Sequence, residues 1–139
     1  MKNNIVYVDK EEAEKIKTNF LNCQNVFLAE VDGSNINSEE EFVLQMSRAF
    51  MFPHELQWLK LGWFVDYICD LMWIDENKEI VLLIDNFEKM LLDDKKLKKR
   101  IIHEFVEIIL PWWEEDVIGH MVGGKTRKFM VYLEVNKHI

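Results

Sequence analysis

The sequence predicts a small α/β fold in which helices pack on a three-stranded parallel sheet. Three apolar runs, at 26–31, 79–85 and 129–135, have the length and composition of buried strands. The stretches between them place apolar residues every three or four positions, which is typical of helices. Strands that alternate with helices favour a parallel sheet covered by those helices.

The first 25 residues are expected to form an N-terminal extension made of a short strand and a charged helix. A short apolar run at 5–8 precedes Asp9, and Ala13, Ile16 and Phe20 then share one helical face. Residues 26–139 are expected to form the main domain, since no linker or repeat divides them.

Three longer helices, and a short one at 87–92, are expected between the strands of the main domain. Ser38 followed by Glu41 is a capping-box pair that begins the first of them, and Pro53 ends it. A second helix is expected over 61–73. A long third helix is expected from about Lys95, with Pro111 bending or ending it.

Composition excludes several classes of protein. The chain has 139 residues, of which 49% are hydrophobic and 12% aromatic, so it is too apolar to be disordered. Its 17 Lys and Arg against 25 Asp and Glu give a formal net charge of −8. An acidic chain is a poor ligand for nucleic acid or an anionic membrane, and it favours a basic protein partner.

The compartment expected from the sequence is the cytoplasm. The chain has only two cysteines, and its short apolar N-terminal run is interrupted at once by Asp9 and Lys10. A secretory leader has a longer apolar stretch, and a small secreted domain has more cysteines.

No pattern in the sequence indicates an enzyme, a metal site or a cofactor site. The four histidines lack metal-ligand spacing, and neither a CxxC nor a GxSxG motif occurs. The run GHMVGG at 119–124 lacks the Lys-Ser/Thr ending of a phosphate-binding loop.

The segment 61–73 is the most informative, because its two helical faces differ in an unusual way. At 100° per residue, one face carries Leu61, Phe64, Val65, Ile68, Leu71 and Met72, which we expect to be buried. The other face carries Trp63, Asp66, Tyr67, Asp70 and Trp73.

Large aromatics around carboxylates are typical of the centre of a protein interface. The outer face is therefore a candidate partner-binding surface, to which the preceding segment adds Glu55 and Trp58. Alternatively, the N-terminal helix or the long third helix covers this face, and Trp63 and Trp73 form a second core layer.

These residues also carry a family resemblance. It rests on VFLAEVDG at 26–33, the helix pattern at 38–50, Phe52-Pro53 and WFVDYICDLMWI at 63–74. In this order they resemble the barstar family of ribonuclease inhibitors, in which a strand ending in DG precedes a helix, an FP pair and an acidic helix. The resemblance implies an inhibitor or immunity protein for a nuclease toxin.

The family motif carries over to individual positions of the acidic helix. Asp66 matches the acid of the family's D-C-L, and Asp70 and Leu71 match its trailing D-L. The acid that precedes these in the family falls on Gly62. The resemblance also places Glu114 and Glu115 beside the inhibitory helix, as a secondary contact. The alternative function is a barstar-like binding or regulatory module for a partner that is not a nuclease.

Overall fold

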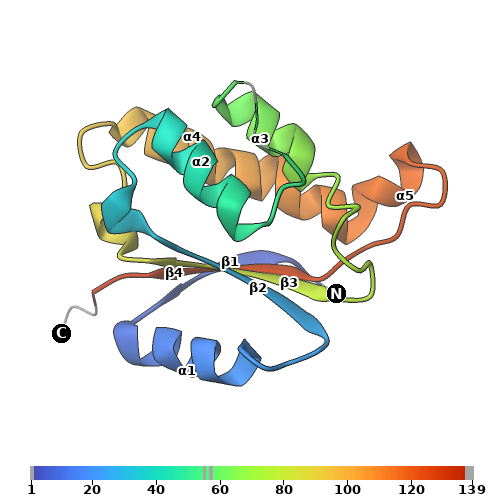
Figure 1. Ribbon diagram of the computed structural model, residues 1–139, viewed down its shortest axis with the longest axis horizontal. Helices are drawn as coiled ribbons and strands as arrows, with labels where there is room; N and C mark the ends of the chain where they lie inside the picture. Colours follow the sequence, from blue (N-terminus) through green and yellow to red (C-terminus); the bar gives the residue numbers. More distant parts are fainter. Residues whose placement is uncertain (1, 55, 57, 137–139) are drawn as a thin grey trace.

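The computed structural model describes residues 2–54, 56 and 58–136, which form one parallel sheet and its covering helices (Figure 1). The strands are β1 (Asn4–Val8), β2 (Val26–Asp32), β3 (Glu79–Asp85) and β4 (Phe129–Glu134). The α-helices are α1 (Lys10–Phe20), α2 (Glu39–Ala49), α3 (Leu61–Ile68), α4 (Lys95–Glu104) and α5 (Val117–His120). The strands lie in the order β1-β4-β3-β2.

The α/β class with a parallel sheet is confirmed, but the sheet has four strands in the described chain rather than three. The additional strand is β1, whose residues pair in parallel with β4, from Asn4 opposite Met130 to Val8 opposite Glu134. The short strand expected in the N-terminal extension therefore belongs to the same sheet as the three apolar runs.

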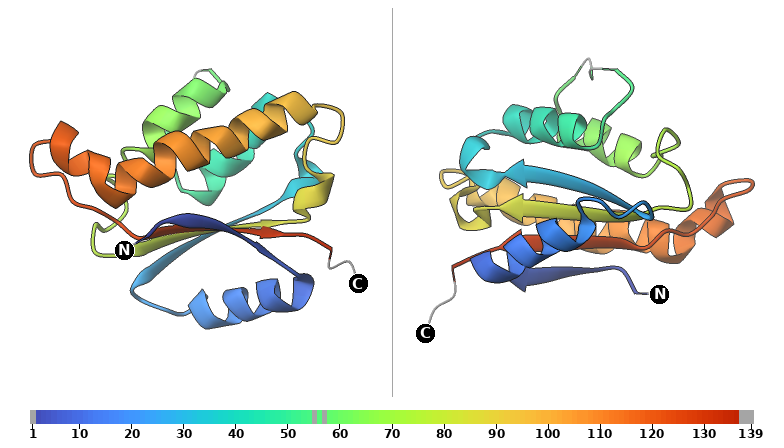
Figure 2. Two further views of the ribbon diagram at one scale, coloured as in Figure 1. Left: turned by 180° about the vertical axis from the view of Figure 1, so that it is seen from behind. Right: turned by 60° about the horizontal axis from the view of Figure 1, so that its bottom comes forward.

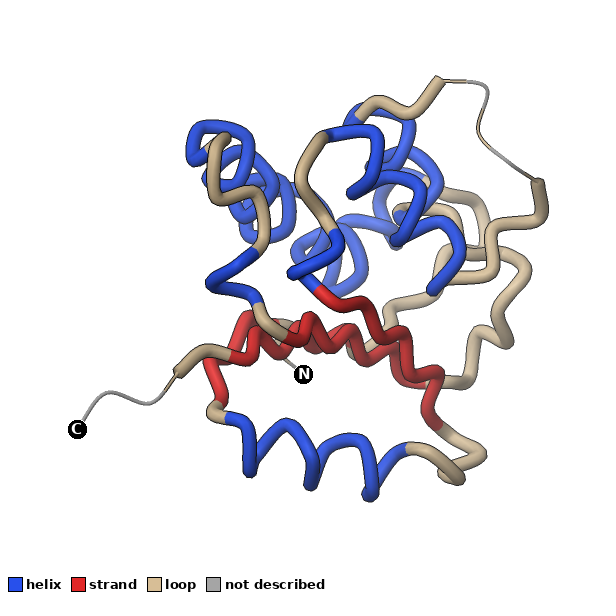
Figure 3. The backbone as a smooth tube through the Cα atoms, turned by 60° about the vertical axis from the view of Figure 1, so that its left-hand side comes forward, coloured by secondary structure: helices blue, strands red, loops and turns tan. Residues whose placement is uncertain are grey.

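Helices cover both faces of this sheet, giving three layers. The helices α2, α3 and α4 lie on one face, while α1 lies alone on the other (Figures 1 and 3). Because β3 is sandwiched between the layers, all five residues from Ile80 to Ile84 are buried. The position of α1 decides what can cover α3, which lies on the opposite side of the sheet.

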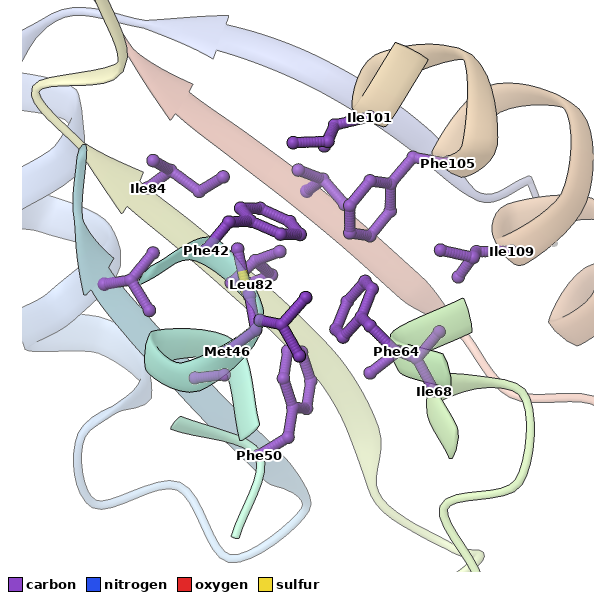
Figure 4. Packing of buried hydrophobic residues seen from close by; sticks show 14 of the residues in the cluster. Phe42, Met46, Phe50, Phe64, Ile68, Leu82, Ile84, Ile101, Phe105 and Ile109 are labelled. Atoms are coloured by element: carbon purple, nitrogen blue, oxygen red, sulfur yellow. The ribbon is translucent and has the colours of Figure 1, made fainter. Parts of the chain in front are cut away.

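The main core lies between the sheet and the three helices above it. Phe42 from α2 meets Phe64 from α3 edge-on, with ring centroids 5.3 Å apart, and both are fully buried (Figure 4). Phe105 comes in from the long helical segment, 6.1 Å from Phe64. These phenylalanines fix α3 against its neighbours and so determine which of its sides faces outward.

The long helical segment does not end at Pro111. The helix α4 continues through two π-helical stretches, Phe105–Ile109 and Trp112–Asp116, into α5 (Figure 2). A π-helical turn bonds residues five apart, and its irregular backbone accommodates a proline that lacks an N–H. None of the helices in the described ranges is long and apolar enough to cross a membrane.

Replacing Gly33 by alanine is expected to lower the free energy of unfolding by about 1–2 kcal/mol, because the new methyl group has no room. A Cβ at Gly33 would lie 2.7 Å from the carbonyl oxygen of Asn86 and 3.0 Å from that of Asp85. Urea unfolding measures the change. The control is Gly119→Ala, where a Cβ has no neighbour within 4 Å. Equal stability of Gly33→Ala and the wild type would contradict this packing.

Candidate partner-binding surface

The helix α3 is held at its start by a neighbouring helix rather than by its own cap. Lys60 precedes the helix and provides no side-chain cap. Instead the backbone N–H of Leu61 donates to Glu39 Oε2 of α2 at 2.9 Å, satisfying one of the free N–H groups of the first turn. Leu61, Phe64 and Ile68 are buried, so three of the six residues expected inward from the helical pattern lie in the core within the helix itself.

The opposite side of α3 faces outward at Gly62, Trp63 and Asp66. The Trp63 side chain is 45% exposed, and Asp66 and Gly62 are also exposed. The alternative in which the N-terminal helix covers this side is wrong, since α1 packs on the other face of the sheet (Figure 2). An exposed indole beside a carboxylate is the arrangement expected of an interface.

The end of α3 departs from the expected helix over 61–73. The helix stops at Ile68, and Leu71 adopts a left-handed conformation with φ of 49°. Leu71 is still fully buried, whereas Met72, expected in the core, is 81% exposed, and Val65 is half-buried. The helical pattern fails at Met72 because the backbone there is no longer helical.

Asp70 consequently lies in the turn after the helix rather than on the same helical face as Asp66. Its backbone N–H donates to the carbonyl oxygen of Tyr67 at 3.0 Å, and its side chain is half-buried. It lines an open groove of about 390 Å³, together with Met72, Glu76, Trp113, Met121 and Val122. Asp70 therefore lines this groove, whereas Asp66 lies on the exposed side of α3.

Tyr67 and Trp73, expected on the outer face, pack against the preceding segment. The Tyr67 ring stacks on Phe52 at 5.4 Å, and its hydroxyl lies 3.1 Å from His54 Nε2. The Trp73 indole also contacts Phe52, and its Nε1 donates to the carbonyl oxygen of Phe50 at 2.8 Å. Both rings are half-buried. Trp73 therefore packs at the edge of the core and is not an open interface residue.

The segment before α3 contributes one clearly exposed candidate. Trp58 is 55% exposed, and nearby Leu56 is buried. Glu55, the other candidate from this segment, lies outside the described residues.

Glu114 and Glu115, the candidates for a secondary contact with a partner, differ in their exposure. Glu114 is half-buried, and its Oε1 accepts a 2.6 Å hydrogen bond from the backbone N–H of Asn3, so it ties the N-terminal strand to the long helical segment. Glu115 is exposed.

The packing of the helices brings a second acidic residue, Glu104, near Asp66. Burial raises the pKa of the Cys69 thiol to about 12, and the negative charges of Asp66 and Glu104 raise it further. Glu104 is the last residue of α4, 38 positions from Asp66 in the chain, and only the packing of α4 beside α3 makes the two carboxylates neighbours of one thiol. Asp66 and Glu104 therefore place two negative charges near one point of this surface.

The carboxylates and aromatics on this side of α3 suit recognition of a positively charged partner. Within the described part of the chain, no three Asp, Glu, His or Cys side chains are placed to hold a metal ion. Carboxylates on a rigid helix accept strong hydrogen bonds from Arg or Lys of a partner, and nearby aromatics exclude water from such pairs.

A family model described as Barstar (barnase inhibitor) matches residues 26–133. No match was found among curated proteins or among solved structures.

Proposed function

Since the chain belongs to the barstar family of barnase inhibitors, we propose that it is an immunity protein that binds and blocks a ribonuclease-type toxin. The observation that carries the proposal is the exposed side of α3, where Asp66 and Trp63 face solvent. The family is one of inhibitors rather than enzymes, and the proposed role of the chain is likewise to bind.

The proposed mechanism is mimicry of the phosphate groups of RNA. A ribonuclease binds phosphate through cationic side chains, and a carboxylate can take the place of phosphate by accepting charge-assisted hydrogen bonds. In this proposal Asp66 occupies the centre of the contact, and Asp70 and Glu115 contribute at its margins. Trp63, Trp58 and the exposed edge of Tyr67 surround these acids and exclude water from them. A cytoplasmic location is part of the proposal, because the RNA to be protected is there.

The first test is inhibition of RNA cleavage. Barnase is the probe, since the family is described by it. Adding the purified chain to barnase in equimolar amount is expected to abolish cleavage of a fluorogenic RNA substrate. Full cleavage activity at a large excess of the chain would contradict inhibition of barnase-type enzymes.

Association with barnase is expected to slow as salt is added. The net charge of −8 attracts a basic protein over a distance, and salt screens this attraction. Stopped-flow measurements should show the association rate constant falling by about tenfold or more between low ionic strength and about 0.5 M salt, with a smaller change in the dissociation rate. An association rate independent of salt would contradict electrostatic steering.

A second candidate function is binding of a partner that is not a nuclease, on the same scaffold. The observation in its favour is Gly62, which stands where the family has the first of its inhibitory acids. The two functions are separated by two measurements. A chain that does not inhibit barnase but binds a host protein that is not a nuclease has the second function.

A further inference from the structure

The face of the sheet opposite α3 carries a charged cluster that connects α1 to two strands. Lys17 Nζ of α1 lies 3.0 Å from Glu30 Oε2 of β2 and 3.2 Å from Asp85 Oδ1 of β3. In the register of the two strands Asp32 is opposite Asp85, so Glu30 and Asp85 point to the same face, toward α1. A third carboxylate, that of Glu14, lies 3.3 Å from Lys17 within the helix.

The apolar contact between α1 and the sheet is small. Its buried members are Val8, Ala13 and Leu83, with only a few half-buried residues around them. The main core, on the other face, contains most of the buried residues. The charged cluster therefore adds to a small apolar contact in holding α1 on the sheet.

The buried side of the cluster, formed by Lys17, Glu30 and Asp85, has an excess of negative charge unless one of the two carboxyls is protonated. Glu30 and Asp85 both contact Lys17 Nζ from the same face of the sheet, at 3.0 Å and 3.2 Å, which brings the two carboxyls together around one proton. Burial, and then the hydrogen bond with Glu30, raise the pKa of Asp85 to about 7. The hydrogen bond with Asp85, supported by Lys17, lowers the pKa of Glu30. Burial alone would lower the pKa of Lys17, but its bonds to Glu30 and Asp85 raise it.

The surrounding charges also oppose a second negative charge in the cluster. The cluster borders an open hollow of about 400 Å³ whose other charged residues are Lys10 and Glu14 of α1, Asp32 of β2 and Glu134 of β4. Hydrogen bonds from Asn86 and Ser34 lower the pKa of Asp32, so it is ionised near neutral pH. Three carboxylates against one lysine leave these surroundings negative. Because the hollow is open, protons exchange freely between the cluster and solvent.

We propose that α1 is a pH-sensitive latch, held on the sheet by Lys17 bound to one proton shared between Glu30 and Asp85. With that proton, Lys17, Glu30 and Asp85 together have one negative and one positive charge, while Glu14 remains an exposed partner of Lys17 on the helix. When the proton is lost, two carboxylates share one lysine in a poorly hydrated site, and the separation of α1 from the sheet lets water solvate them. The latch therefore weakens as the pH rises through the pKa of Asp85. Separation of α1 from the sheet exposes Leu28 and Leu83, on the face of the sheet that α1 covers.

Hydrogen exchange of the full-length chain tests the latch without any partner. Protection factors of the amides of α1 and β3, corrected for the intrinsic exchange rate, are measured by NMR at about pH 6 and about pH 8. We expect α1 to open about tenfold more often at the higher pH, because the carboxyl of Asp85 has a pKa of about 7 in the closed state and an ordinary, much lower pKa in the open state. Protection of Leu82 in β3 should stay the same.

Three variants show whether the cluster is responsible. Asp85→Asn imitates the protonated carboxyl and should remove the pH dependence while keeping α1 protected at both pH values. Lys17→Met should lower protection at both. Lys15→Met is the matched control, since Lys15 lies on the same helix in an exposed pair with Glu11 at 3.9 Å, and it should change neither. A pH dependence that persists in Asp85→Asn, or a wild-type α1 equally protected at both pH values, would overturn the proposal.

Discussion

Replacing Asp66 by alanine is expected to weaken the complex with barnase by about two to three orders of magnitude. In the proposed complex this carboxylate is desolvated against a cationic group, and removing it leaves that partner charge buried without a counterion. Such truncations cost about 2–5 kcal/mol, and each 1.4 kcal/mol is about tenfold in affinity. Titration calorimetry or surface plasmon resonance measures the change, which should lie mainly in the dissociation rate.

A control variant separates the effect of a direct contact with barnase from the effect of the net charge of the chain. Glu11→Ala removes one negative charge from an exposed position on α1, on the other face of the sheet. It should slow association slightly and leave dissociation unchanged. Asp70→Ala should have an effect between the two, because Asp70 lies in the turn after α3. Equal affinities of Asp66→Ala and Glu11→Ala would show that Asp66 is not in the interface.

The fold class was predictable because its main determinants are local in sequence. The three apolar runs at 26–31, 79–85 and 129–135 became β2, β3 and β4, since each is long enough to be buried between layers. The fourth strand joins the same sheet through pairing of Asn4 with Met130, and no local pattern reveals a partner 126 positions away. Asp9 and Glu12 form a capping box that begins α1, and the spacing of these two residues is a local signal of the same kind as Ser38 and Glu41.

The candidate site was predictable only as far as α3 remains helical. Extending the helical pattern to Trp73 placed Met72 in the core, but the helix ends at Ile68. Its end is stabilised by distant donors, since Trp113 Nε1 donates to the carbonyl oxygen of Ile68 at 2.9 Å. Arg127, which is only 5% exposed, donates to the carbonyl oxygens of Leu71 and Ile74. Donors that follow so much later in the chain cannot be assigned from the sequence of the helix.

Contacts between residues far apart in the chain also explain the positions of Glu104 and Trp73, which the helical pattern does not predict. Glu104 is near Asp66 only because α4 packs beside α3. The Trp73 indole has its hydrogen-bonding partner at Phe50, 23 positions earlier, so its aromatic character serves the fold. The residues whose exposure did follow from the pattern, Trp63 and Asp66, lie in the regular part of the helix.

Replacing Gly62 by aspartate is expected to strengthen binding of barnase by about ten- to a hundredfold. The family has an acid at this position, on the same exposed side of α3 as Asp66, and a hydrogen bond to a charged group contributes about 1.5–3 kcal/mol. The structure has room for the side chain, because a Cβ at Gly62 has no neighbour within 4 Å. Gly62 is also the second residue of α3, where a negative charge is favourable to the helix dipole. Competition for barnase against the wild-type chain gives the ratio of affinities directly.

The control is Gly62→Ala, which adds a Cβ without a charge. Alanine in an exposed helix is more stable than glycine by about 1 kcal/mol, so Gly62→Ala should unfold at a higher denaturant concentration and bind with unchanged affinity. If Gly62→Asp binds barnase more tightly while Gly62→Ala does not, the outer side of α3 meets the cationic site as proposed, and the wild-type glycine limits affinity for this enzyme. If neither variant changes the affinity while Asp66→Ala still weakens it, the partner's cations lie only around Asp66. If none of the three substitutions matters, α3 is not the contact surface, and the scaffold binds its partner elsewhere.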